Sequence, residues 1–241
     1  MKIEKYLSKL DDNNSHVRIS SLVELGRKKD PVSVSYILKI AGKEKNEDVR
    51  AQIAICLGEI GSIEAGDVLI EFTKDSEPLV RMEAASSLGI IGARGFIEAK
   101  TSLERLISDK NYTVRKNAIK ALGLCGDHET ITHLLGIFEK EGSSIEIKAI
   151  IAQTIGQIGG SLAMKILTEW ALKGSMEVRR ETINALGMLG DETTVDLLIH
   201  IMREKREDKV IRNYAREALK NIVTVARDKY LIIRKKIENY L

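Results

Sequence analysis

Apolar side chains recur along the chain at helical spacing, and the arrangement itself repeats. After Arg50, for example, apolar side chains stand three, four, seven and ten residues on, as Ile53, Ala54, Leu57 and Ile60. At about 100° per residue these four side chains share one face of a helix. A similar arrangement follows a basic residue in seven copies, at Arg18, Arg50, Arg81, Arg115, Lys148, Arg179 and Arg212. The pattern predicts one amphipathic helix in each copy.

Start and stop signals flank these predicted helices. Four residues before the basic residue, most copies place a side chain that caps helix N-termini well, namely Asn14, Asn46, Asn111, Ser144, Ser175 and Asp208. Eleven residues after the basic residue, most copies place a glycine, namely Gly61, Gly92, Gly126, Gly159 and Gly190. We expect these glycines to end the helix, because glycine takes the left-handed conformation at little cost.

A further glycine falls in the middle of the predicted helix, eight residues after the basic residue. It occurs as Gly26, Gly58, Gly89, Gly123, Gly156 and Gly187. Glycine inside a helix costs about 1 kcal/mol relative to alanine, so its recurrence indicates a structural reason. We expect the backbones of neighbouring helices to approach each other closely at these glycines.

A second apolar helix precedes the first in each copy, as Ile37 with Leu38 and Leu197 with Leu198 illustrate. Its predicted starts include Asp30 before Pro31, Asp127 and Asp191. The basic residues stand 31 to 34 positions apart, and helix pairs at this period stack into an α-solenoid. The sequence therefore predicts an all-α superhelix of about seven helical hairpins, forming a single domain over residues 1–241.

Both ends of the chain depart from the repeat. Ile3, Tyr6, Leu7 and Leu10 form one stripe of a short helix before the first copy. The seventh copy replaces both glycines, by Lys220 and Val223, and is followed by a stripe of Tyr230, Ile233, Ile237 and Leu241. Because an open stack must shield its terminal apolar faces, residues 227–241 are predicted to hold a C-terminal capping helix, spanning about 227–240.

The composition fits a helical core and a cytoplasmic protein. The chain is 44% hydrophobic but only 4% aromatic, so Ile, Leu, Val and Ala must build the core. No stretch approaches the roughly 20 apolar residues that span a bilayer, and the N-terminus lacks the apolar region of a signal peptide. Cys56 and Cys125 occupy small-residue positions in different copies, where packing is the expected role.

One copy carries a recognisable consensus. Residues 109 to 127, DKNYTVRKNAIKALGLCGD, follow the order D-x-x-x-x-V-R-x-x-A-x-x-A-L-G-x-x-G-D almost throughout. This order resembles the HEAT-like repeats first named from phycobilisome lyases, and the resemblance covers nearly the whole chain. The resemblance implies a structural role for an aspartate six residues before the arginine. Asp12, Asp75 and Asp109 hold this position before Arg18, Arg81 and Arg115. We expect these aspartates to act with the arginines to link successive repeats. The signatures of tetratricopeptide and ankyrin repeats do not occur.

Catalytic and metal-binding patterns are weak. His128 and His133 stand five apart, about 140° around a helix, whereas an HExxH zinc site needs a spacing of four. HEAT-repeat deoxyhypusine hydroxylases hold iron with several His-Glu dyads, and His128-Glu129 is the sole such dyad here. The resemblance also allows two other enzyme classes, bilin lyase-like and DNA glycosylase-like enzymes. For a glycosylase, Trp170 is the one tryptophan that the chain offers. We expect no enzyme activity, no metal and no cofactor.

The predicted binding surface is the exposed side of the glycine-containing helices. Positions two, five and nine residues after the basic residue point away from the buried face, and solenoids commonly bind ligands on a concave surface lined by such helices. We expect a monomer that binds a protein or peptide there, through Gln52, Glu59, Glu83, Ser86, Asn117, Lys120, Gln153, Gln157, Glu181, Asn184, Met188, Tyr214, Glu217 and Asn221.

Basic residues concentrate at the C-terminal end. Residues 203 to 241 contain 12 Lys and Arg against 6 Asp and Glu, although the whole chain is only +3. The excess fits either a solvated capping surface or a site for an acidic protein, a nucleic acid or an anionic lipid. Nucleic-acid binding is thus the alternative function, with Arg212, Arg216, Arg227, Arg234, Lys235 and Lys236 as its candidate residues.

Overall fold

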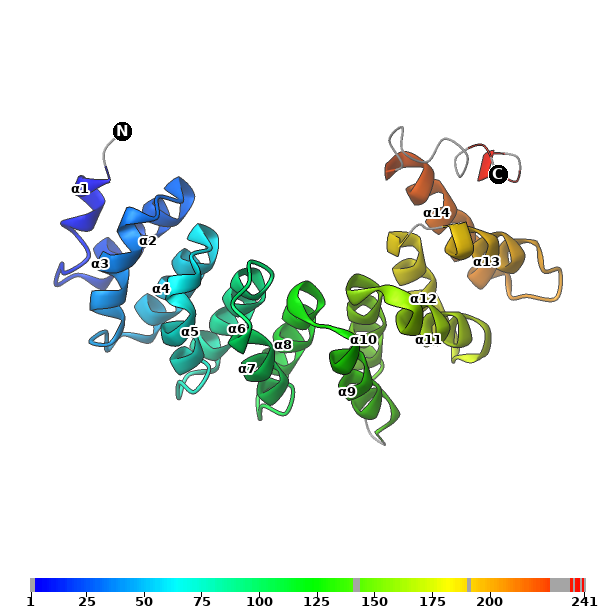
Figure 1. Cartoon of the computed structure of the whole chain (residues 1–241), viewed down its shortest axis with the longest axis horizontal. Helices are drawn as coiled ribbons and strands as arrows, with labels where there is room; N and C mark the ends of the chain where they lie inside the picture. Colours follow the sequence, from blue (N-terminus) through cyan, green and yellow to red (C-terminus); the bar gives the residue numbers. More distant parts are fainter. Residues whose placement is uncertain are drawn as a thin grey trace. The chain divides into compact units, whose positions relative to one another are not determined.

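The computed structural model describes residues 3–140, 144–189 and 192–225, together with residues 235, 237, 238 and 240. Every element within these residues is helical, which confirms the all-α fold (Figure 1). The chain divides into two compact units, Met1–Cys125 and Gly126–Leu241. The single domain over residues 1–241 stays a prediction.

The basic residue of each repeat is called the motif residue from here on. In the first unit, the helices that carry it pack against one another in chain order, α2 on α4, α4 on α6 and α6 on α8. We call these the motif helices. Each is packed against the helix that precedes it, so the unit is a stack of helical hairpins. The elements are α1 (Glu4–Leu7), α2 (Ser15–Lys28), α3 (Val32–Ala41), α4 (Glu47–Ile60), the 3-10 helix η1 (Ile63–Ala65), α5 (Gly66–Phe72), α6 (Pro78–Gly92), α7 (Glu98–Leu106) and α8 (Tyr112–Cys125).

The second unit repeats the arrangement, because its motif helices α10, α12 and α14 pack consecutively and each contacts its own preceding helix. Its elements are α9 (His128–Glu139), α10 (Ile145–Ile158), α11 (Gly160–Lys173), α12 (Met176–Leu189), α13 (Glu192–Arg203) and α14 (Lys209–Val225). Repeated hairpins of this kind confirm the predicted solenoid architecture.

The predicted N-caps shape the starts of the motif helices. The Asn46 side chain accepts a hydrogen bond from the Val49 backbone N–H at 3.1 Å, and Asn14, Asn111, Ser144, Ser175 and Asp208 cap their helices in the same way. Asp127 forms a capping box with Thr130 at the start of α9. These bonds satisfy backbone donors that the helix leaves unpaired, so the sequence signals act through a local mechanism.

The mid-helix glycines lie where motif helices approach most closely. A Cβ added to Gly58 would lie 2.7 Å from the Ser87 Cβ, and one added to Gly89 would lie 2.9 Å from the Ala121 Cβ. In the second unit, Gly156 faces Ala185 and Gly187 faces Ala218 in the same manner. The facing residues all stand six positions after their own motif residue and are small. The expected close approach is confirmed at these four glycines.

The described glycines eleven residues after the motif residue fall at helix ends as predicted, but not all of them take the left-handed conformation. Gly61 ends α4 with a φ of 72°, and Gly159 follows α10 with a φ of 73°. Helix α6 also ends at Gly92, but the left-handed conformation falls at Gly95, with a φ of 107°. Gly92 instead makes room for packing, because an added Cβ would lie 2.8 Å from the Cys125 Cβ.

The N-terminal end follows its prediction in part. Helix α1 is only one turn long and packs on α2, and Leu10 beyond it is buried. The predicted C-terminal capping helix lies almost entirely outside the described residues, although the Ile237 side chain is fully buried. Gly190 and Asp191 also lie outside the described residues.

Candidate protein-binding surface

The fourteen residues of the predicted binding stripe all reach the surface of their units. None is buried: Glu59, Lys120, Gln157, Asn184, Met188, Glu217 and Asn221 are exposed, and Gln52, Glu83, Ser86, Asn117, Gln153, Glu181 and Tyr214 are half-buried. Their helices are fixed by the opposite face, where residues such as Ile53 and Leu186 are fully buried. Within each unit the stripe is thus the outer face of packed helices, and its use in binding stays a prediction.

In the first unit the stripe combines polar and apolar side chains. The Ser86 Oγ lies 3.5 Å from the Asn117 Oδ1, so one polar contact joins α6 to α8. Burial raises the pKa of the Glu83 carboxyl above its ordinary value. Ile90 and Leu124 are 37% and 53% exposed at the ninth position after their motif arginines. These two residues were not among the predicted binding residues, although they occupy a predicted position.

In the second unit polar side chains connect three motif helices. The Gln153 Nε2 donates to the Glu181 Oε2 at 3.3 Å, and the Arg180 Nε donates to the Glu181 Oε1 at 2.9 Å. The Arg180 guanidinium in turn lies over the Tyr214 ring, 5.9 Å from its centroid. We call Gln153, Glu181, Arg180 and Tyr214 the polar line. Arg180 was missed because it stands only one residue after the motif arginine.

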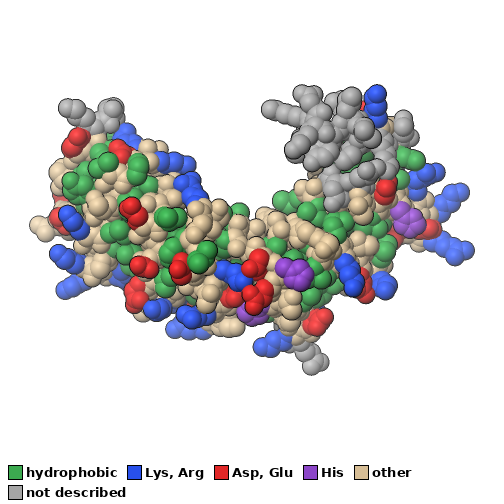
Figure 2. Space-filling view, viewed as in Figure 1, with side chains coloured by type: hydrophobic (Ala, Val, Ile, Leu, Met, Phe, Trp, Pro, Cys, Tyr) green, Lys and Arg blue, Asp and Glu red, His purple; other side chains and the backbone are tan. Residues whose placement is uncertain are grey.

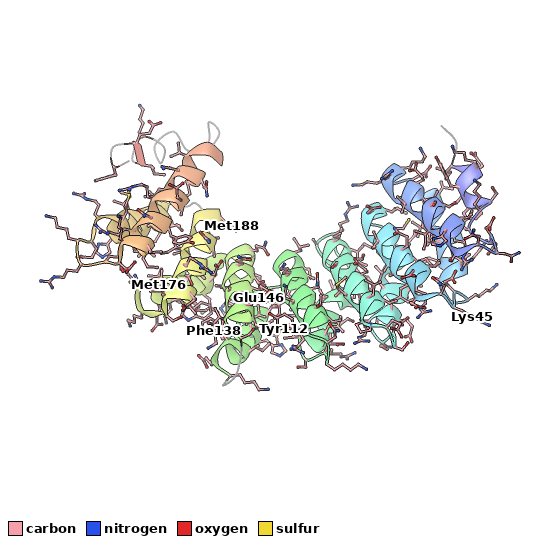
Figure 3. The ribbon with its side chains drawn as sticks, turned by 180° about the vertical axis from the view of Figure 1, so that it is seen from behind. Lys45, Tyr112, Phe138, Glu146, Met176 and Met188 are labelled. Carbon is pink, nitrogen blue, oxygen red and sulfur yellow. The ribbon has the colours of Figure 1, made fainter. Side chains whose placement is uncertain are left out.

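Two exposed methionines stand at the ends of α12. Met176 and Met188 mark its two ends (Figure 3) and are 44% and 67% exposed. Asn184 lies between the polar line and Met188 in sequence and is exposed. A flexible thioether beside amide side chains suits contact with a partner that offers both apolar and peptide groups.

Ion pairs join successive repeats at the loops in the first unit. The Arg50 Nε and Nη2 donate to the Asp75 carboxylate at 2.7 and 3.0 Å, and Arg81 pairs with Asp109 at 2.8 and 2.9 Å. Arg18 pairs with Glu44 in the same bidentate manner. These side chains are 6% to 15% exposed, so solvent screens them less than surface pairs. We call them the linking pairs, and they confirm the implied link for Asp75 and Asp109, whereas the Asp12 carboxylate accepts a hydrogen bond from the Asn14 backbone N–H.

The linking pairs control the protonation of their carboxylates. Burial alone would raise the pKa of Asp75, but the hydrogen bond from Arg50 and the one from the Glu77 backbone N–H hold it below its ordinary value. The pKa values of Glu44 and Asp109 are lowered by the same balance of burial against hydrogen bonds from their arginines. Because these acids stay ionised near neutral pH, the pairs are intact there.

The second unit uses the motif position differently. Arg179 donates to both carboxylate oxygens of Glu207 at 2.9 and 2.5 Å, and its Nε donates to the Ala171 carbonyl. Lys148 instead lies 5.1 Å from the centroid of the Phe138 ring. That ring stacks on Trp170 with centroids 3.7 Å apart and an interplanar angle of 13°. Trp170 is therefore packed against Phe138 between α9 and α11.

The family comparison accounts for this repeated geometry. A family model described as HEAT repeats matches residues 3–89, 67–145 and 139–220, which is most of the chain. The chain is a HEAT-repeat protein.

Known proteins of similar sequence and structure extend the comparison. The uncharacterized phycocyanin operon protein Z of Pseudanabaena tenuis (strain PCC 7409) is 22% identical over 192 residues, which span 76% of this HEAT-repeat chain and 93% of that protein. The structure of the complex of CpcE and CpcF of phycocyanin lyase from Nostoc sp. PCC7120 is similar with a TM-score of 0.62 and 17% identity, covering 100% of this chain and 95% of that chain. YibA of E. coli has a TM-score of 0.56 and 20% identity, covering 100% and 88%. At these identities the structural likeness shows the fold.

The residues considered for chemistry in this HEAT-repeat protein are scattered. His128 and His133 are both exposed, and no group of three or more His, Cys, Asp or Glu in the described part of the chain could hold a metal ion. Burial, with the nearby Glu59 charge, raises the pKa of the Cys56 thiol to about 12. Such a thiol stays protonated, which fits the expected packing role. The Cys125 Sγ lies 3.7 Å from the Ala121 carbonyl oxygen, also within the stack.

The basic C-terminal residues are partly described. Arg212 is half-buried, whereas Arg216 and Lys235 are exposed. Arg227, Arg234 and Lys236 lie outside the described residues. Further exposed basic side chains, Arg203, Lys205, Arg206 and Lys209, surround the loop between α13 and α14, where Figure 2 shows a group of Lys and Arg side chains. None of the described helices has the length and apolar content needed to cross a membrane.

Proposed function

We propose that this HEAT-repeat protein is a non-enzymatic scaffold that binds a protein or peptide along the stripe of its motif helices. The polar line in the second unit carries the proposal. It joins side chains of α10, α12 and α14 into one surface, and the glycine contacts underneath hold the same helices at fixed spacing. A binding surface held in one arrangement loses little conformational entropy when a partner docks.

The chemistry of the stripe favours a peptide-like ligand. Gln153, Gln157, Asn184 and Asn221 each carry a primary amide, which can donate to a peptide carbonyl and accept from a peptide N–H. The charged residues of the polar line, Arg180 and Glu181, neutralise each other. A surface of this kind lacks the run of unpaired positive charge that dominates nucleic-acid binding.

The comparisons supply context for the class of partner. CpcE and CpcF of phycocyanin lyase form a complex with each other, and the similar protein of Pseudanabaena tenuis is named for a phycocyanin operon. A HEAT-repeat fold of this kind is therefore compatible with a role in a protein assembly. This supports a protein partner, and lyase activity does not follow from a shared fold.

The test compares two matched triple variants of the full chain as bait in the extract of its native cell. The stripe variant replaces Asn184, Met188 and Asn221 by alanine, and the control replaces Lys165, Glu169 and Leu172, which are exposed on α11. Both sets leave the net charge unchanged. We expect the wild type and the control to retain a specific protein that the stripe variant loses, and purified partner should then bind the stripe variant at least about tenfold more weakly.

Two results would contradict the proposal. Equal retention of the partner by the stripe variant and the control would place binding elsewhere. Nucleic acid that stays with the purified protein at about 0.2 M salt, detected by its absorbance, would instead favour the nucleic-acid alternative, since nonspecific phosphate contacts weaken steeply with salt.

A further inference from the structure

The side of α6 that points away from the core carries a row of four side chains. They follow one another at intervals of four, three and four residues, so they lie within about 60° of one another around the helix. In chain order they are Leu79, Glu83, Ser86 and Ile90. Leu79 and Ile90 are 43% and 37% exposed, so the row has an accessible apolar side chain at each end and polar groups between them.

Glu83 is the one charged member of this row, and its side chain is half-buried. Among the described residues its carboxylate has no hydrogen-bond partner and no opposite charge close enough to oppose the rise that burial causes in its pKa. The neighbouring Ser86 hydroxyl donates to the Met82 backbone carbonyl instead. A partly buried carboxylate is stabilised when a cation lies beside it, so this position favours a ligand that brings one.

The helices on either side of α6 continue this surface. α4, α6 and α8 pack side by side in that order (Figure 1). At the positions that correspond to the row, Ile55 of α4 is half-buried and Leu124 of α8 is exposed, so the apolar character extends to both neighbours. Asp48 and Glu59 of α4 are exposed acids, and Lys120 of α8 is the one basic side chain at these described positions. With the carboxylate of the row, the surface holds three acids and one base, which favours a basic ligand.

We propose that this surface binds a basic amphipathic helix of a partner protein, with apolar side chains on Leu79 and Ile90 and a Lys or Arg side chain on Glu83. A helix aligned with α6 has the same rise per residue, so side chains at its positions i, i+4 and i+11 reach all three. By that rise the row is about 16 Å long, which three turns of the partner helix cover. The inference rests on the proposed use of the stripe in binding and names the chemistry that its first unit accepts.

The test measures by fluorescence anisotropy how the full chain binds three labelled helical peptides of about 20 residues, built mainly from alanine and glutamine. The first carries two leucines eleven residues apart, with lysines four and seven residues after the first leucine, so that either direction of the helix places one lysine at Glu83. The second has glutamates in place of the lysines, and the third has the lysines on the opposite face. We expect the wild type to bind the first peptide at least about tenfold more tightly than the second and about threefold more tightly than the third.

A reversal of charge guards against misfolding. Glu83→Lys should bind the glutamate peptide more tightly than the lysine peptide, and an unfolded protein would not gain that binding. The matched control is Glu71→Lys, which makes the same change at an exposed residue of α5. It should keep the preference of the wild type, because Glu71 lies outside the stripe.

Several results would overturn the inference. Equal binding of the lysine and glutamate peptides would show that Glu83 reads no charge, and no binding of any peptide at about 1 mM would show that the surface takes no such helix. Unchanged binding of the lysine peptide by Glu83→Lys would place the peptide elsewhere. A wild-type dimer in sedimentation velocity that Glu83→Lys dissociates would assign the surface to a second copy of this chain.

The peptide measurement and the extract test of the proposed function can fail separately. The stripe variant changes Asn184, Met188 and Asn221 in the second unit and leaves α6 intact. Loss of the native partner by that variant, without any peptide binding, would keep the proposed function and remove this inference. Peptide binding that follows Glu83, with the native partner fully retained by the stripe variant, would do the reverse.

Discussion

The two units use one motif position in different ways. In the first unit Arg18, Arg50 and Arg81 each pair with a carboxylate of the next repeat, whereas Arg115 donates to backbone carbonyls and lies over the Tyr112 ring. In the second unit Arg179 does so, Lys148 lies over an aromatic ring, and the Arg212 Nε has no partner among the described residues. The motif helices nonetheless stack in the same manner in both units. Helix stacking therefore depends on the apolar face and the glycines, and the ion pairs are an addition to it.

The residue at one loop position explains why the two units differ in their ion pairs. Glu44 and Asp75 each stand two residues before the N-cap of the next motif helix, at Asn46 and Glu77. The corresponding position before Ser175 holds Lys173, which pairs with Glu169 instead. A lysine at that position cannot accept a hydrogen bond from Lys148. The Lys148 ammonium lies over the Phe138 ring instead. The first unit should therefore respond more strongly than the second to changes that remove or protonate carboxylates.

The largest effect is expected from removing one carboxylate of a linking pair. Asp109→Ala leaves the Arg81 side chain, which is 6% exposed, without its acceptor. We expect the free energy of unfolding to fall by about 3 kcal/mol, because a shielded charge is left unpaired. The matched control is Glu169→Ala, whose pair with Lys173 is 61% and 76% exposed and should contribute less than about 0.5 kcal/mol. Urea unfolding followed by circular dichroism would measure both, and equal losses would refute the distinction.

A smaller effect is expected from the glycines that set the helix spacing. Gly89→Ala places a Cβ 2.9 Å from both the Ala121 Cβ and the Ala121 carbonyl oxygen, so we expect a loss of about 1 to 3 kcal/mol. Gly136→Ala is the control, since its added Cβ meets nothing within 4 Å inside α9. That substitution should stabilise the protein by up to about 1 kcal/mol through helix propensity. Stabilisation by both substitutions would show that close approach does not explain the mid-helix glycines.

Acid should weaken the first unit before the second, because it has three carboxylates of lowered pKa in such pairs against one. The pKa values of Glu44, Asp75 and Asp109 in the first unit and of Glu207 in the second are lowered in the folded protein, so their pairs stabilise it fully above the ordinary carboxyl pKa of about 4. This stabilisation is lost as the pH falls from about 4 through the lowered values. Hydrogen exchange read by mass spectrometry from pH 5 to about pH 3 should show protection lost earlier in α2 to α8 than in α10 to α14. The reverse order would contradict the comparison.

The sequence predicted the elements better than the contacts between them. Caps such as Asn46 and the spacing of apolar residues act within one helix, so one repeat is enough to predict them. The helix end at Gly92 was predicted, but its packing role was not, because that role depends on Cys125, which is 33 residues away. Glu44 and Glu207 also escaped prediction as ion-pair acceptors, because only the stacking of helices brings them to Arg18 and Arg179. Where function depends on such contacts, as at the polar line, the sequence alone could name positions but not their partners.

The smallest effect is expected at Glu83, where one substitution should raise stability and weaken binding. Burial raises the pKa of this carboxyl, so its ionised form destabilises the folded protein at pH values above the ordinary glutamate pKa of about 4.3. Glu83→Gln removes that charge at nearly constant volume and should raise the midpoint of urea unfolding slightly at pH 7. The difference from the wild type should shrink as the pH falls below about 4, where both side chains are neutral. Ser86→Ala is the neighbouring control on the same stripe and should show no such pH dependence.

If the first unit's part of the stripe contacts the partner, Glu83→Gln should bind it more weakly despite its greater stability, whereas a gain in both stability and affinity would argue that Glu83 lies outside the interface.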